Sequence, residues 1–108
     1  MPDLRSKSLD RLFEVVLSLK TVDACYSFFE DICTIKELED MAQRLDAAFL
    51  LNEGMNYQTI AQEIGISTAT ISRVSKCLKY GSGYRYAIDK ITEKAERDFL
   101  FFLFCGIL

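Results

Sequence analysis

The sequence predicts an all-α protein of about six helices. Its 108 residues include one proline and five glycines, so few turn-forming residues interrupt long regular segments. Apolar residues recur at spacings of three and four, the period of amphipathic helices, and no segment alternates with the period of two expected of a strand. The length fits one domain covering residues 1–108.

Three helices are expected in the first half of the chain. Residues 8–20 carry one apolar stripe, made of Leu9, Leu12, Phe13, Val16 and Leu17. A second helix is expected from Val22 to about Ile32. The third opens on a capping box, Thr34-Ile-Lys-Glu37, in which each end residue bonds the other's free backbone N–H. It ends near Gly54 and directs Leu38, Met41, Leu45, Ala48 and Phe49 inward.

The second half predicts three further helices. Asn56 is a suitable N-cap for a short helix over 57–64, and Ser67 for the next helix, over 68–79. Gly81-Ser82-Gly83 forms a break, after which the last helix runs from Tyr84. The segment 99–108 holds no charged residue, yet it is half as long as a transmembrane helix. We expect this apolar C-terminal tail to pack into a partner subunit, and we expect no membrane partner; a tail that touches a membrane surface, or an irregularity of the sequence, is the alternative.

Residues 57–76 match a helix–turn–helix at seven positions. Five of them are apolar and close a small core: Ile60, Ile64, Ile66, Ile71 and Val74. Ala61 is small where the two helices touch. Gly65 stands in the turn, where φ is positive. A helical hairpin formed only for packing is the alternative, but it does not require this alanine and glycine together.

The charges are segregated along the chain. The net charge is −3, which by itself disfavours a nucleic-acid partner. However, residues 21–63 hold nine acidic residues against two basic ones, whereas residues 64–88 hold no acidic residue and four basic ones. The positive charge therefore lies in the segment that contains the second half of the helix–turn–helix, as expected of a surface that faces duplex DNA.

The second helix of this motif has small polar side chains followed by basic ones. Short hydroxyl side chains let a helix enter the major groove and contact base edges, and the basic groups can contact phosphates. We expect the helix 68–79 to lie in the major groove of a double-stranded DNA operator. The expected DNA-binding residues are Gln58, Ser67, Thr68, Ala69, Thr70, Ser72, Arg73, Lys76 and Lys79.

Other function classes are disfavoured. The chain has no histidine, no glycine-rich phosphate loop and no nucleophile motif, so we do not expect an enzyme. The four cysteines, Cys25, Cys33, Cys77 and Cys105, lack metal-ligand spacing, so we expect free thiols and no metal. Charges throughout 1–20 argue against a secretory signal and favour a cytoplasmic location. The alternative function is a helical protein-interaction module that does not contact DNA directly.

From about Cys33 to Lys79 the sequence resembles the tryptophan repressor family. The matching residues are Thr34-x-x-Glu37, Arg44, Gly54-Met55, Ala69-Thr-Ile-Ser-Arg73 and Leu78-Lys79. The sequence is more similar still to the Trp-repressor-like regulators of Gram-positive bacteria. The resemblance implies a bacterial DNA-binding transcriptional regulator, most simply a repressor. It also implies an intertwined homodimer whose subunits share one core.

The resemblance further implies a corepressor pocket. Thr34, Arg44 and Arg73 match the positions that hold tryptophan in the family, where two guanidinium groups can stack on an indole ring. Val74, however, replaces a glycine of the tryptophan-binding members, and Cys77 replaces a serine. Because a branched side chain at 74 would occupy the space of the ring, we expect no cofactor. Tryptophan or a related corepressor is the alternative, and pairing with carboxylates or phosphate is the simpler role for both arginines.

Overall fold

A computed structural model describes residues 3–107, with side chains described up to Leu103. Within residues 3–107 the chain forms six α-helices and no strand, which confirms the predicted all-α class. The helices are α1 (Lys7–Ser18), α2 (Val22–Ile32), α3 (Ile35–Asn52), α4 (Tyr57–Ile64), α5 (Thr68–Tyr80) and α6 (Gly83–Ile107). The chain divides into two compact units, one up to Glu39 and one from Asp40 onward.

The first unit contains α1 and α2, which are capped as short independent helices. The hydroxyl of Ser6 accepts the Leu9 N–H at 3.1 Å, and the hydroxyl of Thr21 accepts the Ala24 N–H at 3.0 Å. Neither helix buries a single residue. The apolar stripe expected of α1 is therefore only partly covered in the single chain: Leu9, Leu12 and Val16 are half-buried, whereas Phe13 is 57% and Leu17 83% exposed.

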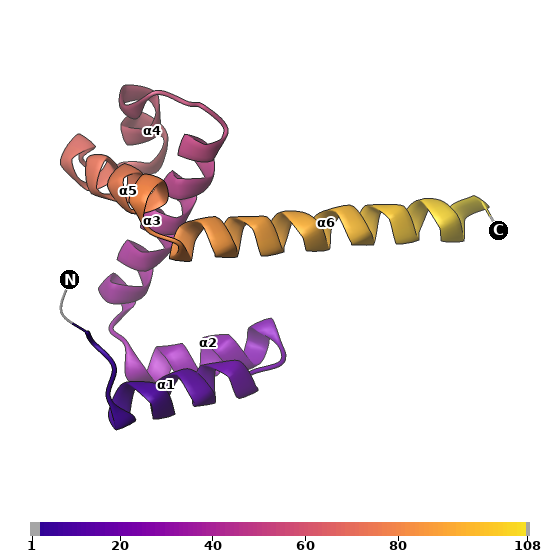
Figure 1. The fold of residues 1–108 in the computed structure, drawn as a ribbon, viewed down its shortest axis with the longest axis horizontal. Coiled ribbons are helices and arrows are strands. Elements are labelled where there is room, and N and C mark those ends of the chain that lie inside the picture. The colour runs from indigo at the N-terminus through magenta and orange to yellow at the C-terminus, as the bar shows by residue number, and fades with distance from the viewer. Residues whose placement is uncertain (1–2, 108) are drawn as a thin grey trace. The chain divides into compact units, whose positions relative to one another are not determined.

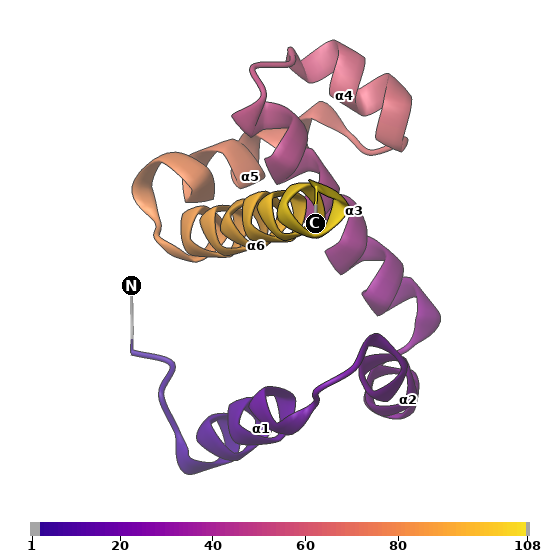
Figure 2. The same ribbon diagram turned by 90° about the vertical axis from the view of Figure 1, so that its right-hand side faces the viewer.

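The second unit contains the hydrophobic core. Among the described residues, α3 to α6 contribute six buried apolar ones, Ala47, Ala48, Ile60, Ile71, Val74 and Ile88, and α5 also contributes the buried polar residue Ser75. Within this unit α5 packs against α4 and against the start of α6 (Figures 1 and 2). Beyond these contacts α6 continues as one long helix (Figure 1).

The inward face of α3 differs in part from the prediction. Ala48 is fully buried and Phe49 half-buried, as expected, but Met41 and Leu45 are each 39% exposed. The residues of α3 that belong to the core all lie at 47–51, in its last turns. Leu38, at the start of the helix, is half-buried as well. Helical spacing identifies a face of α3, but the middle of that face, at Met41 and Leu45, stays exposed in the single chain.

The C-terminal tail continues α6. Its first five residues, 99–103, are all exposed, and Phe101 and Phe102 are each more than 70% accessible. No helix among residues 3–107 combines the length and the apolar composition needed to cross a membrane. The side chains of 104–108, including the thiol expected at Cys105, lie outside the described residues, whereas Cys25, Cys33 and Cys77 are free thiols.

Candidate nucleic-acid interface

The helix–turn–helix forms with the caps that the sequence predicts. Asn56 begins α4, and its side-chain oxygen accepts the Thr59 N–H at 2.9 Å. Gly65 ends α4 in the left-handed region, at φ 82°, and its N–H donates to the Ala61 carbonyl at 2.8 Å. Ser67 then begins α5, and its hydroxyl accepts the Thr70 N–H at 3.1 Å. These local bonds define where the turn starts and ends.

The turn is held by a small core shared between α4 and α5. Ile60 and Ile71 are fully buried and Val74 is 2% exposed. Ala61, Ile64 and Ile66 are partly buried and pack against them. Because the apolar side chains of α5 face this core, most of its polar side chains lie on the opposite, exposed side, and Ser75 is the buried exception among them. The exposed side is the candidate DNA-binding surface.

Most of the predicted DNA-binding residues are exposed. Ser72, Lys76 and Lys79 follow one another at spacings of four and three, so they form one row along α5. Arg73 is exposed as well. At the start of the helix and in α4, the other exposed members are Gln58, Ser67, Thr68 and Ala69.

Thr70 is placed differently from the other candidates. It is half-buried, and its hydroxyl oxygen lies 3.0 Å from the hydroxyl oxygen of Ser67. The same Ser67 oxygen also accepts the Thr70 backbone N–H. The side chains of these two residues therefore bond each other at the N-terminus of α5, while Ser72 presents a hydroxyl without such a local partner in the described structure.

The electrostatics of this surface are uniformly positive. Residues 64–88 contain no carboxylate, and among residues 3–107 none of Arg73, Lys76 and Lys79 forms an ion pair with an acidic side chain. In DNA-binding proteins generally, basic side chains without a nearby carboxylate neutralise backbone phosphates and release their counterions. The exposed face of α5 has the charge that such a contact requires.

The residues expected to hold a corepressor lie in both units. The hydroxyl of Thr34 accepts the Glu37 N–H at 3.1 Å, and Glu37 accepts the Thr34 N–H at 2.9 Å, so the predicted capping box forms. The bond that the Thr34 backbone N–H donates to the Glu37 carboxylate is the largest cause that lowers the pKa of this carboxyl, and a side-chain hydrogen bond from Thr34 lowers it further. Arg44 and Arg73 are both exposed, and neither pairs with a carboxylate within residues 3–107.

An apolar depression opens beside Cys77. Its volume is about 450 Å³, and it is lined by Leu45, Cys77, Gly81, Gly83, Tyr84 and Ala87. No charged side chain lines it, so it offers no counter-charge to the carboxylate or ammonium group of an amino acid. Within residues 3–107, no three cysteine or carboxylate side chains gather as metal ligands would.

A sequence model of the family described as Trp repressor protein matches residues 7–95, which is most of the chain. The chain belongs to the Trp repressor family. The match covers the helix–turn–helix and the first half of α6, and it leaves out the apolar tail.

Individual relatives agree with this assignment. The uncharacterised protein YerC of Bacillus subtilis is 53% identical over 91 residues, which cover 83% of this chain and 88% of YerC. A Trp operon repressor homolog of Chlamydia caviae is 40% identical over 67 residues, covering 61% of this chain and 66% of that protein. The crystal structure of a TrpR-like protein from Eubacterium eligens has a TM-score of 0.80 and 43% identity, covering 82% of this chain and 93% of that one. The predicted family and its Gram-positive branch are confirmed.

Two polar residues near the C-terminal half of α5 were not among the predicted site residues. Arg85 donates a guanidinium N–H to the side-chain oxygen of Asn52 at 2.6 Å. The signal available in the sequence was that Arg85 lies in the same acid-free segment as α5. Asn52 offered no signal, because 33 residues separate it from Arg85 and only the fold brings them together.

Proposed function

We propose that this protein is a sequence-specific DNA-binding transcriptional regulator, acting as a repressor and as a homodimer. The observation that carries the proposal is the exposed face of α5, where small hydroxyl side chains and unpaired basic ones stand on a correctly capped helix–turn–helix. Membership of the Trp repressor family supports it independently.

In this proposal α5 enters the major groove with its N-terminal half against the base edges. Thr68, Ala69 and Ser72 are short enough to let the helix approach closely, and they offer hydroxyl and methyl groups to the bases. Lys76 and Lys79 lie one and two turns further on and contact phosphates. Base contacts select the operator, and phosphate contacts hold the helix in register.

The homodimer is supported by the first unit. A helical segment that buries none of its residues in the single chain has no core of its own. Large apolar side chains remain accessible there, among them Phe13, Leu17, Val22, Tyr26 and Ile32. A second copy that covers them would bury this surface and would also present two recognition helices to two half-sites.

Duplex binding measured against salt concentration tests the DNA-binding proposal. The preferred duplex is first selected from a random pool, and affinity is then compared with that for an unrelated duplex. Affinity should fall steeply as salt rises, because each neutralised phosphate releases counterions. Ser72→Ala should reduce discrimination between the two duplexes roughly fivefold, the value of one hydrogen bond. Lys76→Gln should weaken binding to both duplexes alike. It should also reduce the salt slope, which is the fall in log affinity per unit rise in log salt concentration, by about one per subunit.

Absence of binding to any selected duplex at low salt would contradict this function. The result would instead favour a helical protein-interaction module, for which the exposed apolar tail of α6 is the supporting observation. If Ser72→Ala and Lys76→Gln changed affinity and salt slope in the same way, the division between base contacts and phosphate contacts would be wrong.

A further inference from the structure

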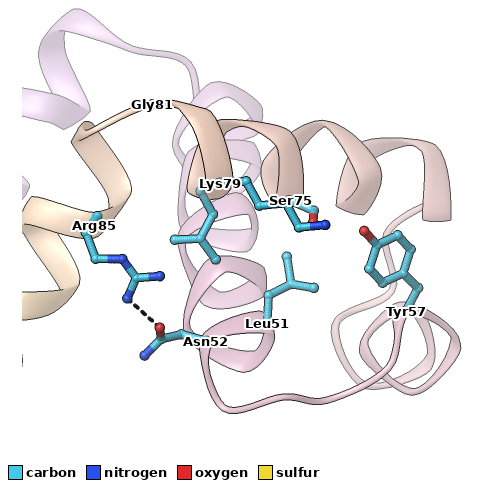
Figure 3. A pocket seen from close by; sticks show the side chains of 8 residues that line it. Leu51, Asn52, Tyr57, Ser75, Lys79, Gly81 and Arg85 are labelled. Carbon is cyan, nitrogen blue, oxygen red and sulfur yellow. Dashed lines mark hydrogen bonds between the residues drawn. The ribbon is translucent and has the colours of Figure 1, made fainter.

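A polar depression lies beside the C-terminal half of α5. Its volume is about 590 Å³, and its walls come from the end of α3, the start of α4, α5 and the start of α6. Figure 3 shows Asn52 and Arg85 at one end of it and Tyr57 at the other, with Ser75 and Lys79 of α5 between them. All of these residues belong to the second unit.

The depression carries positive charge that no acid compensates. Of the eight residues that line it, two are basic and none is acidic. Neither Lys79 nor Arg85 forms an ion pair with a carboxylate among residues 3–107. Lys79 and Arg85 both give the depression a positive electrostatic potential. An anion bound there would be attracted by both charges.

The guanidinium of Arg85 is held by a neutral partner. Its Nη1 donates to the Oδ1 of Asn52 at 2.6 Å, which orients the group and leaves its charge intact. That bond uses one of five N–H donors, and the amide nitrogen of Asn52 adds further donors. The side chains of Tyr57, which is exposed, and of Ser75, which is largely buried, place hydroxyl groups on the other walls. Such a donor set suits the oxygen atoms of a phosphate group.

The depression lies next to the surface that faces the groove. Lys79 belongs both to its lining and to the exposed row of Ser72 and Lys76 on α5. Tyr57 is the first residue of α4, and in a helix–turn–helix the first helix crosses the DNA backbone. A phosphate at the edge of the major groove would therefore reach the depression from the side where α5 enters.

We propose that this depression binds one phosphate of the DNA backbone, with Arg85 and Lys79 as its cationic ligands and Asn52 as the residue that positions Arg85. The inference rests on the proposed function and adds a backbone contact from α6, outside the helix–turn–helix. It assigns roles to two residues, Asn52 and Arg85, that the recognition helix does not contain.

The central test compares Arg85→Gln with Arg97→Gln in the full chain. Both variants remove an exposed arginine from α6, but only Arg85 lines the depression. Arg85→Gln should weaken binding to the selected and the unrelated duplex equally, about tenfold, the value of one charged hydrogen bond. It should also reduce the salt slope by about one per subunit. Arg97→Gln should bind as the unchanged protein does.

Two further variants test the geometry. Arg85→Lys keeps the charge, so its salt slope should match that of the unchanged protein while its affinity is intermediate. Asn52→Ala should also lower duplex affinity without changing the salt slope. The double variant Asn52→Ala/Arg85→Gln should bind duplex as weakly as Arg85→Gln alone, because Asn52 acts through Arg85. Additive losses accompanied by a lower melting temperature would show that Asn52 acts only on stability, and its positioning role would be overturned.

The outcomes separate this inference from the proposed function. If the unchanged protein binds duplex and Arg85→Gln binds equally well with the same slope, the phosphate site alone is overturned. The alternative ligand is a free phosphate compound. It is tested by adding inorganic phosphate while the NMR signal of the Arg85 Nε–H is monitored. A saturable shift of that signal together with unimpaired duplex binding by Arg85→Gln would assign the depression to a free phosphate compound. If the unchanged protein binds no duplex, both proposals fail.

Discussion

Val74 is the clearest difference between this chain and the tryptophan-binding members of the family, which have a glycine at that position. Its side chain is 2% exposed and belongs to the core between α4 and α5. Its neighbour Arg73 is exposed and pairs with no acid in the described structure, so one half of an arginine clamp is present. We propose that the regulator works without tryptophan, because a branched valine stands at the position that is a glycine in the tryptophan-binding members of the family.

We expect no saturable heat when tryptophan is titrated into the protein, and equal duplex affinity with and without millimolar tryptophan. Cys77→Ser restores the polar group of the tryptophan-binding members at an exposed position. This variant should also fail to bind, because it leaves Val74 in place. A saturable heat from the unchanged protein, or a duplex affinity that rises with tryptophan, would refute the prediction. Binding gained by Cys77→Ser alone would show that the missing hydroxyl, not the valine, is the obstacle.

At the scale of the helices, the start of α3 depends on a pair of reciprocal bonds between Thr34 and Glu37. Thr34→Ala removes the hydroxyl that accepts the Glu37 N–H and should lower the free energy of unfolding by about 1 kcal/mol. Thr34→Ser keeps the hydroxyl and serves as the matched control, so it should change little. Urea unfolding followed by circular dichroism measures both. Equal stabilities of the alanine and serine variants would mean that the cap contributes nothing.

The same cap predicts a pH dependence. The pKa of Glu37 is lowered in the folded state because its carboxylate accepts bonds from Thr34. A carboxyl with a lowered folded pKa stabilises the protein above its unfolded pKa, and this contribution is lost as the pH falls through the folded value. The stability difference between the unchanged protein and Glu37→Ala should therefore be present at neutral pH and shrink in acid.

The helices and their caps could be predicted from the sequence, because each is determined by residues within one turn of each other. Asn56, Gly65 and Ser67 act where the sequence placed them. The polar depression with Asn52 and Arg85 could not be predicted in this way. Asn52 belongs to α3 and Arg85 to α6, so the two residues meet only in the folded chain. Exposure of Met41 likewise depends on how far the neighbouring helices extend along α3.

At the scale of the whole molecule, apolar surface is distributed unevenly. Among residues whose side chains are described, buried ones occur only in the second unit, although α1 and α2 of the first unit are amphipathic as well. Periodicity shows that a helix has an apolar face but cannot show whether the same chain or another one covers it. Several large apolar side chains that stay exposed on one helix pair are typical of an interface between proteins.

We therefore expect a homodimer in solution whose stability depends on α1. Sedimentation equilibrium should give a mass about twice the 12.4 kDa of the chain, and the melting temperature should rise with protein concentration. Phe13→Glu or Leu17→Glu should each promote dissociation. Burial of one such side chain is worth about 1.5–3 kcal/mol, or roughly ten- to a hundredfold in the dissociation constant.

Arg11→Glu is the matched control, because it places the same side chain on the polar face of α1. That variant should remain dimeric, and its duplex affinity should match that of the unchanged protein. The two stripe variants should lose duplex affinity together with the dimer, because two recognition helices joined in one particle bind two half-sites with a higher effective concentration than separate ones. A protein that sediments as a 12.4 kDa particle at all concentrations and still binds the selected duplex tightly would contradict the homodimer.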